Sequence, residues 1–131
     1  MKDEKILVDT SVWIDYFKGQ NDYIVKLMDD ILTKNNIYIP KVIIAELIQG
    51  AKSEKEISVI EEFLYVFFIV DNSKDTWIKA GKLSFSMKKH GKTVNLIDCY
   101  IAIIAQENDC IIFTLDGHFK DIKNFLKFKL M

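Results

Sequence analysis

The apolar run Ile6 to Val8, together with the acid that ends it, constrains this chain more than any other feature. The run is short and rich in β-branched residues, which is typical of a fully buried strand. It stops abruptly at Asp9, and two hydroxyl residues, Thr10 and Ser11, follow. Asp9 is therefore predicted at the carboxyl end of a strand, where open α/β sheets bind ligands. Alternatively, Asp9, Thr10 or Ser11 only caps the helix expected over residues 12–18.

The rest of the chain alternates between helical and strand patterns. This alternation predicts one α/β domain, residues 1–131, with a parallel β-sheet flanked by helices on both faces. The predicted strands are 6–8, 37–39, 67–70 (ending at Asp71), 110–113 and 128–130. The predicted helices are 12–18, one capped by Asn21 or Asp22, 41–49, 54–67, one that runs from Ser73 or Asp75 to about His90, 93–106 and 121–126.

Composition excludes several classes of protein. The chain has 131 residues, half of them hydrophobic, which is enough for a core and argues against disorder. Its apolar runs fall short of the roughly 20 residues that span a bilayer, and its start lacks the pattern of a signal peptide, so we expect a cytoplasmic protein without membrane contact. Cys99 and Cys110 lack the spacing of metal ligands and are expected to be buried, reduced thiols.

Charge limits how the protein would recognise nucleic acid. The formal net charge is −1, and all 18 positively charged residues are Lys. Phosphate recognition would therefore depend on lysines, backbone N–H groups and hydroxyls instead of arginine forks. Lys88, Lys89 and Lys92 either form a phosphate-holding patch or are the solvated end of a helix.

Three further acids occupy positions where a charged carboxylate is costly. Asp116 follows the strand 110–113, so it should reach the same edge of a parallel sheet as Asp9. Glu46 and Asp98 lie in predicted helices whose neighbouring residues are nearly all apolar. A charge in such surroundings costs several kcal/mol unless a cation or a metal offsets it. Because the chain supplies no Arg, we predict that the four carboxylates converge on a divalent metal ion.

Each of these acids also has an interpretation without a metal. Asp98 stands three residues after Asn95, as in a helix-capping arrangement. Glu46 is compatible with the exposed face of an amphipathic helix, and Asp116 with Gly117 forms an ordinary turn pair. The prediction of a metal site therefore depends on the four acids taken together.

A ligand set of carboxylate oxygens favours Mg²⁺ or Mn²⁺ over zinc. Such sites typically bind substrate phosphates and support displacement at phosphorus by an activated water. We therefore predict phosphodiester hydrolysis, with the hydroxyls of Thr10, Ser11 and Thr114 holding water or a phosphate oxygen. His90 and His118 are compatible with metal-free acid–base catalysis. However, His90 suits a helix C-terminus, and His118 lies in the turn after Asp116, where it can touch substrate.

Four stretches resemble the successive motifs of PIN-domain nucleases, and most of all those of VapC toxins. They are residues 8–17 (VDTSVWIDYF), 45–50 (AELIQG), 98–102 (DCYIA) and 114–119 (TLDGHF). The resemblance covers nearly the whole chain. It implies a Mg²⁺- or Mn²⁺-dependent endoribonuclease that cleaves RNA, forms a homodimer and is inhibited by a VapB-type antitoxin whose tail fills the active groove. The absence of Arg departs from many relatives.

The resemblance also assigns roles to residues. Asp9 and Asp98 would be the principal metal ligands, and Glu46 and Asp116 would complete the catalytic cluster. Thr114 and the pair Thr10 and Ser11 would support it. Asp15 also falls in the first motif, but it is left out because it is expected to be exposed on a helix.

Three other functions are compatible with parts of the pattern. A PIN-domain nuclease of RNA processing would act outside a toxin–antitoxin pair. A PIN-like scaffold would work by protein contacts alone, although scaffolds tend to lose acids. A phosphoaspartyl phosphatase also places an Asp after the first strand, but it generally has a second acid two residues later, where this chain has Ser11.

Overall fold

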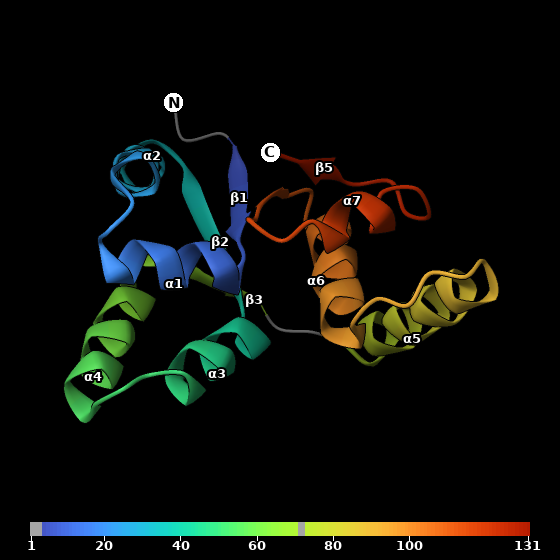
Figure 1. Ribbon diagram of the computed structural model, residues 1–131, viewed down its shortest axis with the longest axis horizontal. Coiled ribbons are helices and arrows are strands. Elements are labelled where there is room, and N and C mark those ends of the chain that lie inside the picture. Colours follow the sequence, from blue (N-terminus) through green and yellow to red (C-terminus); the bar gives the residue numbers. More distant parts are fainter. Residues whose placement is uncertain (1–3, 71–72) are drawn as a thin grey trace.

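A computed structural model describes residues 4–70 and 73–131, and Asp71, predicted at the end of the third strand, lies outside these ranges. The described residues form a five-stranded sheet, seven α-helices and one 3₁₀ turn (Figure 1). The strands are β1 (Lys5–Val8), β2 (Asn36–Pro40), β3 (Phe68–Val70), β4 (Ile111–Phe113) and β5 (Lys129–Leu130). The helices are α1 (Thr10–Lys18), α2 (Asp22–Lys34), α3 (Lys41–Gln49), α4 (Glu54–Phe63), η1 (Leu64–Val66), α5 (Lys74–Lys89), α6 (Leu96–Glu107) and α7 (His118–Ile122).

The sheet is parallel throughout, with the strand order β3-β2-β1-β4-β5. The chain moves outward from β1 to β3 and then returns to place β4 on the other side of β1. Right-handed crossovers put helices on one face in the first direction and on the opposite face in the second. Figure 1 shows this division, with α1 to α4 on one side of the strands and α5 to α7 on the other. The predicted α/β class with two covered faces is confirmed.

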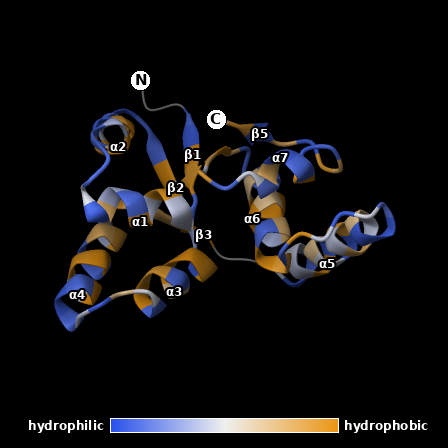
Figure 2. Ribbon diagram, viewed as in Figure 1, coloured by the Kyte–Doolittle hydropathy of each residue, from blue (hydrophilic) through white to orange (hydrophobic). Residues whose placement is uncertain are grey.

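The core lies between the sheet and its helices. β1 is buried almost completely, and α6 is buried continuously from Cys99 to Ala105, which is why its sequence is apolar nearly all round. Figure 2 shows hydrophobic colour along most of α6, whereas the outer end of α5 is hydrophilic. Cys99 and Cys110 are both buried and free, and burial raises the pKa of both thiols.

Several predicted boundaries were wrong, each for a local reason. The first helix begins at Thr10 instead of residue 12. The predicted helix 54–67 ends at Phe63, because the chain tightens into η1 and brings the Phe67 ring to 5.2 Å from that of Trp13. The helix predicted over 93–106 begins only at Leu96. Asn95 is its cap, since its side chain accepts a hydrogen bond from the N–H of residue 97.

The last helix and the last strand also differ from the prediction. A helix was predicted over 121–126, but α7 occupies His118–Ile122, and β5 begins at Lys129 instead of residue 128. Its early start follows from a hydrogen bond that the N–H of His118 donates to the side chain of Asp116 at 2.9 Å.

Among the described residues, the helices are too short or too polar to cross a membrane.

We predict that Thr76→Val lowers the free energy of unfolding by about 1–2 kcal/mol. The buried hydroxyl of Thr76 donates to Glu107 Oε1 at 2.7 Å and ties the start of α5 to the end of α6. Valine keeps the shape but leaves this carboxylate with one partner fewer. Urea unfolding measures the effect, with Ser58→Ala as the exposed control. Equal stability of the two variants would contradict a role for this bond.

Candidate active site

The acids gather at the carboxyl edge of the sheet, between β1 and β4. The strand order changes direction between these two strands, and open α/β sheets bind ligands at such switch points. Val8 pairs with Phe113 in register, and the N–H of Asp9 donates to the carbonyl of Phe113 at 2.9 Å. The residues that follow β1 and β4 therefore lie side by side.

Asp9 is the N-cap residue of α1, but its side chain is held by hydroxyl groups and does not cap the helix. The residue is 5% exposed, and its side chain makes no capping hydrogen bond to α1. Oδ2 accepts from Ser11 Oγ at 2.9 Å and from Thr114 Oγ1 at 2.8 Å. These hydroxyl oxygens in turn accept from the N–H groups of Leu115 at 3.0 Å and Asp116 at 2.9 Å. The hydroxyls of Ser11 and Thr114, two of the three that were predicted to hold water or phosphate, thus orient the Asp9 carboxylate.

Asp98 lies in the first turn of α6, and its side chain is 15% exposed. The pKa of this carboxyl is raised to about 6, mainly by burial, and then by the negative charges of Asp116 and Asp9. His118 opposes the rise through a hydrogen bond and its charge. The negative charges of Asp116 and Asp9 therefore disfavour the ionised form of Asp98.

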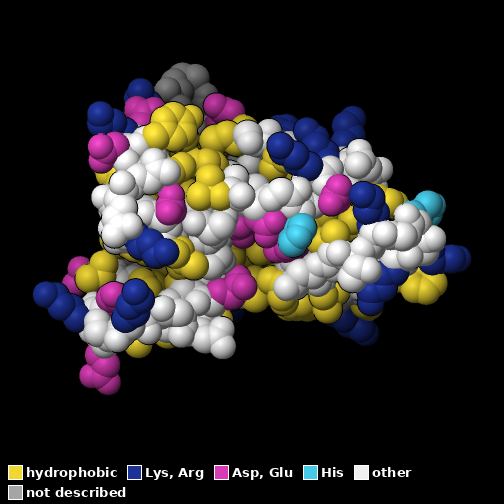
Figure 3. Space-filling model, in the orientation of Figure 1, with side chains coloured by type: hydrophobic (Ala, Val, Ile, Leu, Met, Phe, Trp, Pro, Cys, Tyr) yellow, Lys and Arg dark blue, Asp and Glu magenta, His cyan; other side chains and the backbone are white. Residues whose placement is uncertain are grey.

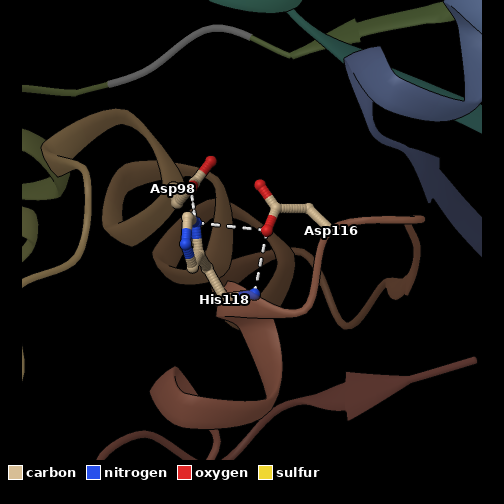
Figure 4. A group of neighbouring side chains, drawn as sticks. All are labelled: Asp98, Asp116 and His118. Carbon is tan, nitrogen blue, oxygen red and sulfur yellow. Dashed lines mark hydrogen bonds and ion pairs between the residues drawn. The ribbon is translucent and has the colours of Figure 1, made fainter.

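His118 lies between two of the acids (Figure 4). Its Nδ1 is 3.1 Å from Asp116 Oδ1 and 3.6 Å from Asp98 Oδ2. One potential ligand atom from each of Asp98, Asp116 and His118 lies within 4.8 Å of the others. From the sequence, His118 was expected to be able to touch substrate and was not predicted as a metal ligand. The available signal was its place two residues after an acid at the end of a strand, because such an acid draws the following N–H groups toward it.

Asp116 both shapes the turn before α7 and faces the other members of the cluster. Its Oδ1 accepts from the N–H of His118 at 2.9 Å, so the turn interpretation is correct for this oxygen. The same side chain is one third exposed and faces His118 and Asp98. A turn residue is therefore also a member of the cluster.

Glu46 lies at the margin of this arrangement. It is half-buried on α3, and its Oε1 accepts from Thr10 Oγ1 at 2.8 Å, which connects it to the residue next to Asp9. Neither Glu46 nor Asp9 is part of the described group of Asp98, Asp116 and His118 that could hold a metal. Asp15 is half-buried rather than exposed, and its carboxylate faces Asn21 at 3.4 Å.

Figure 3 shows acidic side chains gathered beside a histidine near the middle of this face. Carboxylates from separate elements, crowded until one of them has a raised pKa, form a site that favours a positively charged ligand. Carboxylate oxygens suit Mg²⁺ or Mn²⁺, and a neutral histidine nitrogen suits Mn²⁺ better than Mg²⁺. The donor set therefore fits a divalent cation.

Comparison with known proteins finds chains of similar sequence and similar fold. Ribonuclease VapC1 of Methanocaldococcus jannaschii is 30% identical over 125 residues, which cover 95% of this chain and 85% of that protein. A chain in the structure of VapBC2 from Rickettsia felis, bound to a promoter DNA fragment, matches with a TM-score of 0.80, 23% identity and 97% of each chain covered. A chain of DNA-bound VapBC from Salmonella typhimurium matches with a TM-score of 0.77 and 21% identity, over 98% of this chain and 97% of that one.

The two structural matches show the fold, and the sequence comparisons also show the family. The PIN domain model matches residues 6–124, which include all four acids. Together with the VapC relative, this match shows that the chain belongs to the PIN-domain family of nucleases.

Proposed function

We propose that this chain is the endoribonuclease toxin of a VapBC-type toxin–antitoxin pair and that it acts as a homodimer. It would hydrolyse RNA phosphodiester bonds with Mg²⁺ or Mn²⁺. The observation that carries the proposal is the group of Asp98, Asp116 and His118, which lies near Asp9 at the switch point of the sheet. The ribonuclease relative supports the activity, and the likeness to VapBC complexes, one of them a VapBC-5 toxin–antitoxin system from Mycobacterium tuberculosis, supports the toxin role.

Asp98 and Asp9 would hold the cation, with Asp116 beside them and Glu46 completing the cluster directly or through water. When bound, a divalent cation would offset the carboxylate charges and activate a water for attack on phosphorus. Ser11 and Thr114 keep the Asp9 carboxylate in one orientation, which leaves its Oδ1 without a hydrogen bond among the described residues. Thr10 orients Glu46 in the same way.

The antitoxin would dock in a groove of about 620 Å³ between α1, α3 and α4. Three apolar side chains that line it, Ile14, Phe17 and Val59, are between 36% and 44% exposed. Glu46 also lines this groove, so a segment lying there would cover an acid of the proposed site. Inhibition and docking would thus involve one continuous surface.

We predict that Asp9→Asn and Asp98→Asn each lower RNA cleavage by at least about a hundredfold, because each removes a charge that holds the cation. Asp15→Asn, from the same motif as Asp9 but outside the cluster, should keep full activity. Cleavage of labelled RNA with Mn²⁺ measures this. The products should carry 5′-phosphate ends, since water and not the RNA 2′-hydroxyl attacks.

Two results would overturn this mechanism. Full activity in EDTA would show that no divalent ion is needed, and 2′,3′-cyclic phosphate ends would show attack by the 2′-hydroxyl. If the wild type with Mn²⁺ cut no RNA and Asp9→Asn still arrested growth, the scaffold function would be correct instead.

The raised pKa of Asp98 predicts how pH and metal affect stability. In the metal-free protein the folded state holds this proton up to about pH 6, whereas the unfolded state releases it near 3.8. Stability from this group is therefore present at low pH and is lost as pH rises through that window, by about 3 kcal/mol in total. Mn²⁺ needs the ionised form, so it should raise Tm by several degrees at about pH 7.5 but little at about pH 5.

Asp98→Asn gives the control for this effect. At about pH 7.5 its metal-free Tm should exceed that of the wild type, and Mn²⁺ should no longer raise it. Thermal unfolding followed by circular dichroism measures both. An equal Mn²⁺ shift in the wild type and the variant would place the cation elsewhere.

We predict that Val59→Lys weakens antitoxin binding at least about tenfold, because it puts a charge into the apolar groove. RNA cleavage by the free protein should not change, since Val59 lies outside the acidic cluster. Calorimetric titration with the protein encoded next to this chain measures the affinity, and Tyr23→Lys, at an exposed aromatic residue outside the groove, is the control. Equal affinities of the two variants would exclude the groove as the docking site.

A further inference from the structure

The two parts of the chain carry opposite charge, which the net charge of −1 conceals. Residues 4–70 contain seven Lys and eleven Asp or Glu, whereas residues 73–131 contain ten Lys and six Asp or Glu. The acidic excess therefore accompanies α1 to α4 on one side of the sheet, and the basic excess accompanies α5 to α7 on the other. Figure 3 shows many lysine side chains over the side of α5 to α7.

The basic excess is concentrated in two segments. Residues 85–95 contain three Lys and no acid, and residues 117–131 contain four Lys and one acid, Asp121. We call five exposed lysines from these segments the basic face. They are Lys88, Lys89, Lys92, Lys120 and Lys123.

Two contacts join the segments into one surface. Lys92 Nζ lies 3.7 Å from Asp121 Oδ1, and the ring of His90 meets the ring of Phe125 edge-on at 5.4 Å between centroids. The end of α5 and the turn after it are therefore fixed against α7.

The basic face begins at the acidic cluster. α7 starts with His118, which contacts Asp116 and Asp98, and Lys120 follows two residues later. α7 therefore carries both a residue of the cluster, His118, and a lysine of the basic face, Lys120. The groove between α1, α3 and α4, in contrast, lies on the side with the acidic excess.

We propose that the basic face holds the RNA strand on one side of the scissile phosphate, an inference that rests on the proposed nuclease function. Lysine ammonium groups bind phosphates as point charges and without fixed geometry, so the face grips the backbone and does not read bases. RNA and antitoxin would therefore have separate surfaces, the basic face and the partly apolar groove between α1, α3 and α4. This also accounts for how a chain without arginine can hold RNA.

The test compares two charge-matched double variants, Lys120→Gln/Lys123→Gln in the basic face and Lys26→Gln/Lys34→Gln on the acidic side. Fluorescence anisotropy measures binding of a labelled single-stranded RNA of about 20 nucleotides in EDTA, over a series of salt concentrations. Each phosphate contact contributes about 0.7 to the slope of log affinity against log salt. The basic-face variant should lose about 1.4 from this slope and bind about tenfold more weakly near physiological salt. The control should match the wild type.

Cleavage with Mn²⁺ gives a second readout, in which KM should rise for the basic-face variant while kcat is retained. If the wild type cleaves RNA and both variants bind RNA with equal affinity and equal salt dependence, the basic face does not hold RNA. The proposed nuclease function would then stand. Loss of antitoxin binding instead of RNA binding would assign the face to the protein partner. If the wild type neither binds nor cleaves RNA, both proposals fail. Equal Tm values of the variants confirm that folding is not the cause.

Discussion

The approach of carboxylates at the junction of β1 and β4 is the constraint on which the candidate site depends. The fold brings Asp9, Asp98 and Asp116 together from a strand end, a helix start and a loop. Burial and these neighbours raise the pKa of Asp98 to about 6, so crowding makes the ionised cluster unfavourable without a positive ligand. The buried helix α6 and the parallel sheet supply the stability that keeps the acids in place.

The hydroxyl groups of the site fix the positions of charges. Ser11 and Thr114 connect backbone N–H groups of the loop after β4 to one oxygen of Asp9. These bonds hold the end of β1 and the loop after β4 in one arrangement, so the distance between Asp9 and Asp116 depends little on side-chain motion. Preorganisation of this kind lets a site bind a cation without first ordering its ligands.

The sequence was sufficient for features that depend on local pattern, namely the buried strand before Asp9 and the parallel sheet with helices on both faces. Features that depend on tertiary contacts were missed. Thr10 lies inside α1, where its hydroxyl donates to Glu46 on α3, a partner 36 residues away in sequence. Likewise, His118 joins the cluster because Asp116 starts α7 early, whereas helical periodicity pointed to residues 121–126.

The unequal distribution of lysines and acids gives the molecule a permanent electric dipole across its sheet, even though its isoelectric point of about 6.1 is unremarkable. A nearly neutral body with such a dipole is turned by an approaching polyanion before the two touch. At physiological ionic strength this torque acts over only about 8 Å, so it orients partners in the last step of an encounter and not from afar. The direction of approach is thereby selected by the whole domain, and the chemistry by a few side chains.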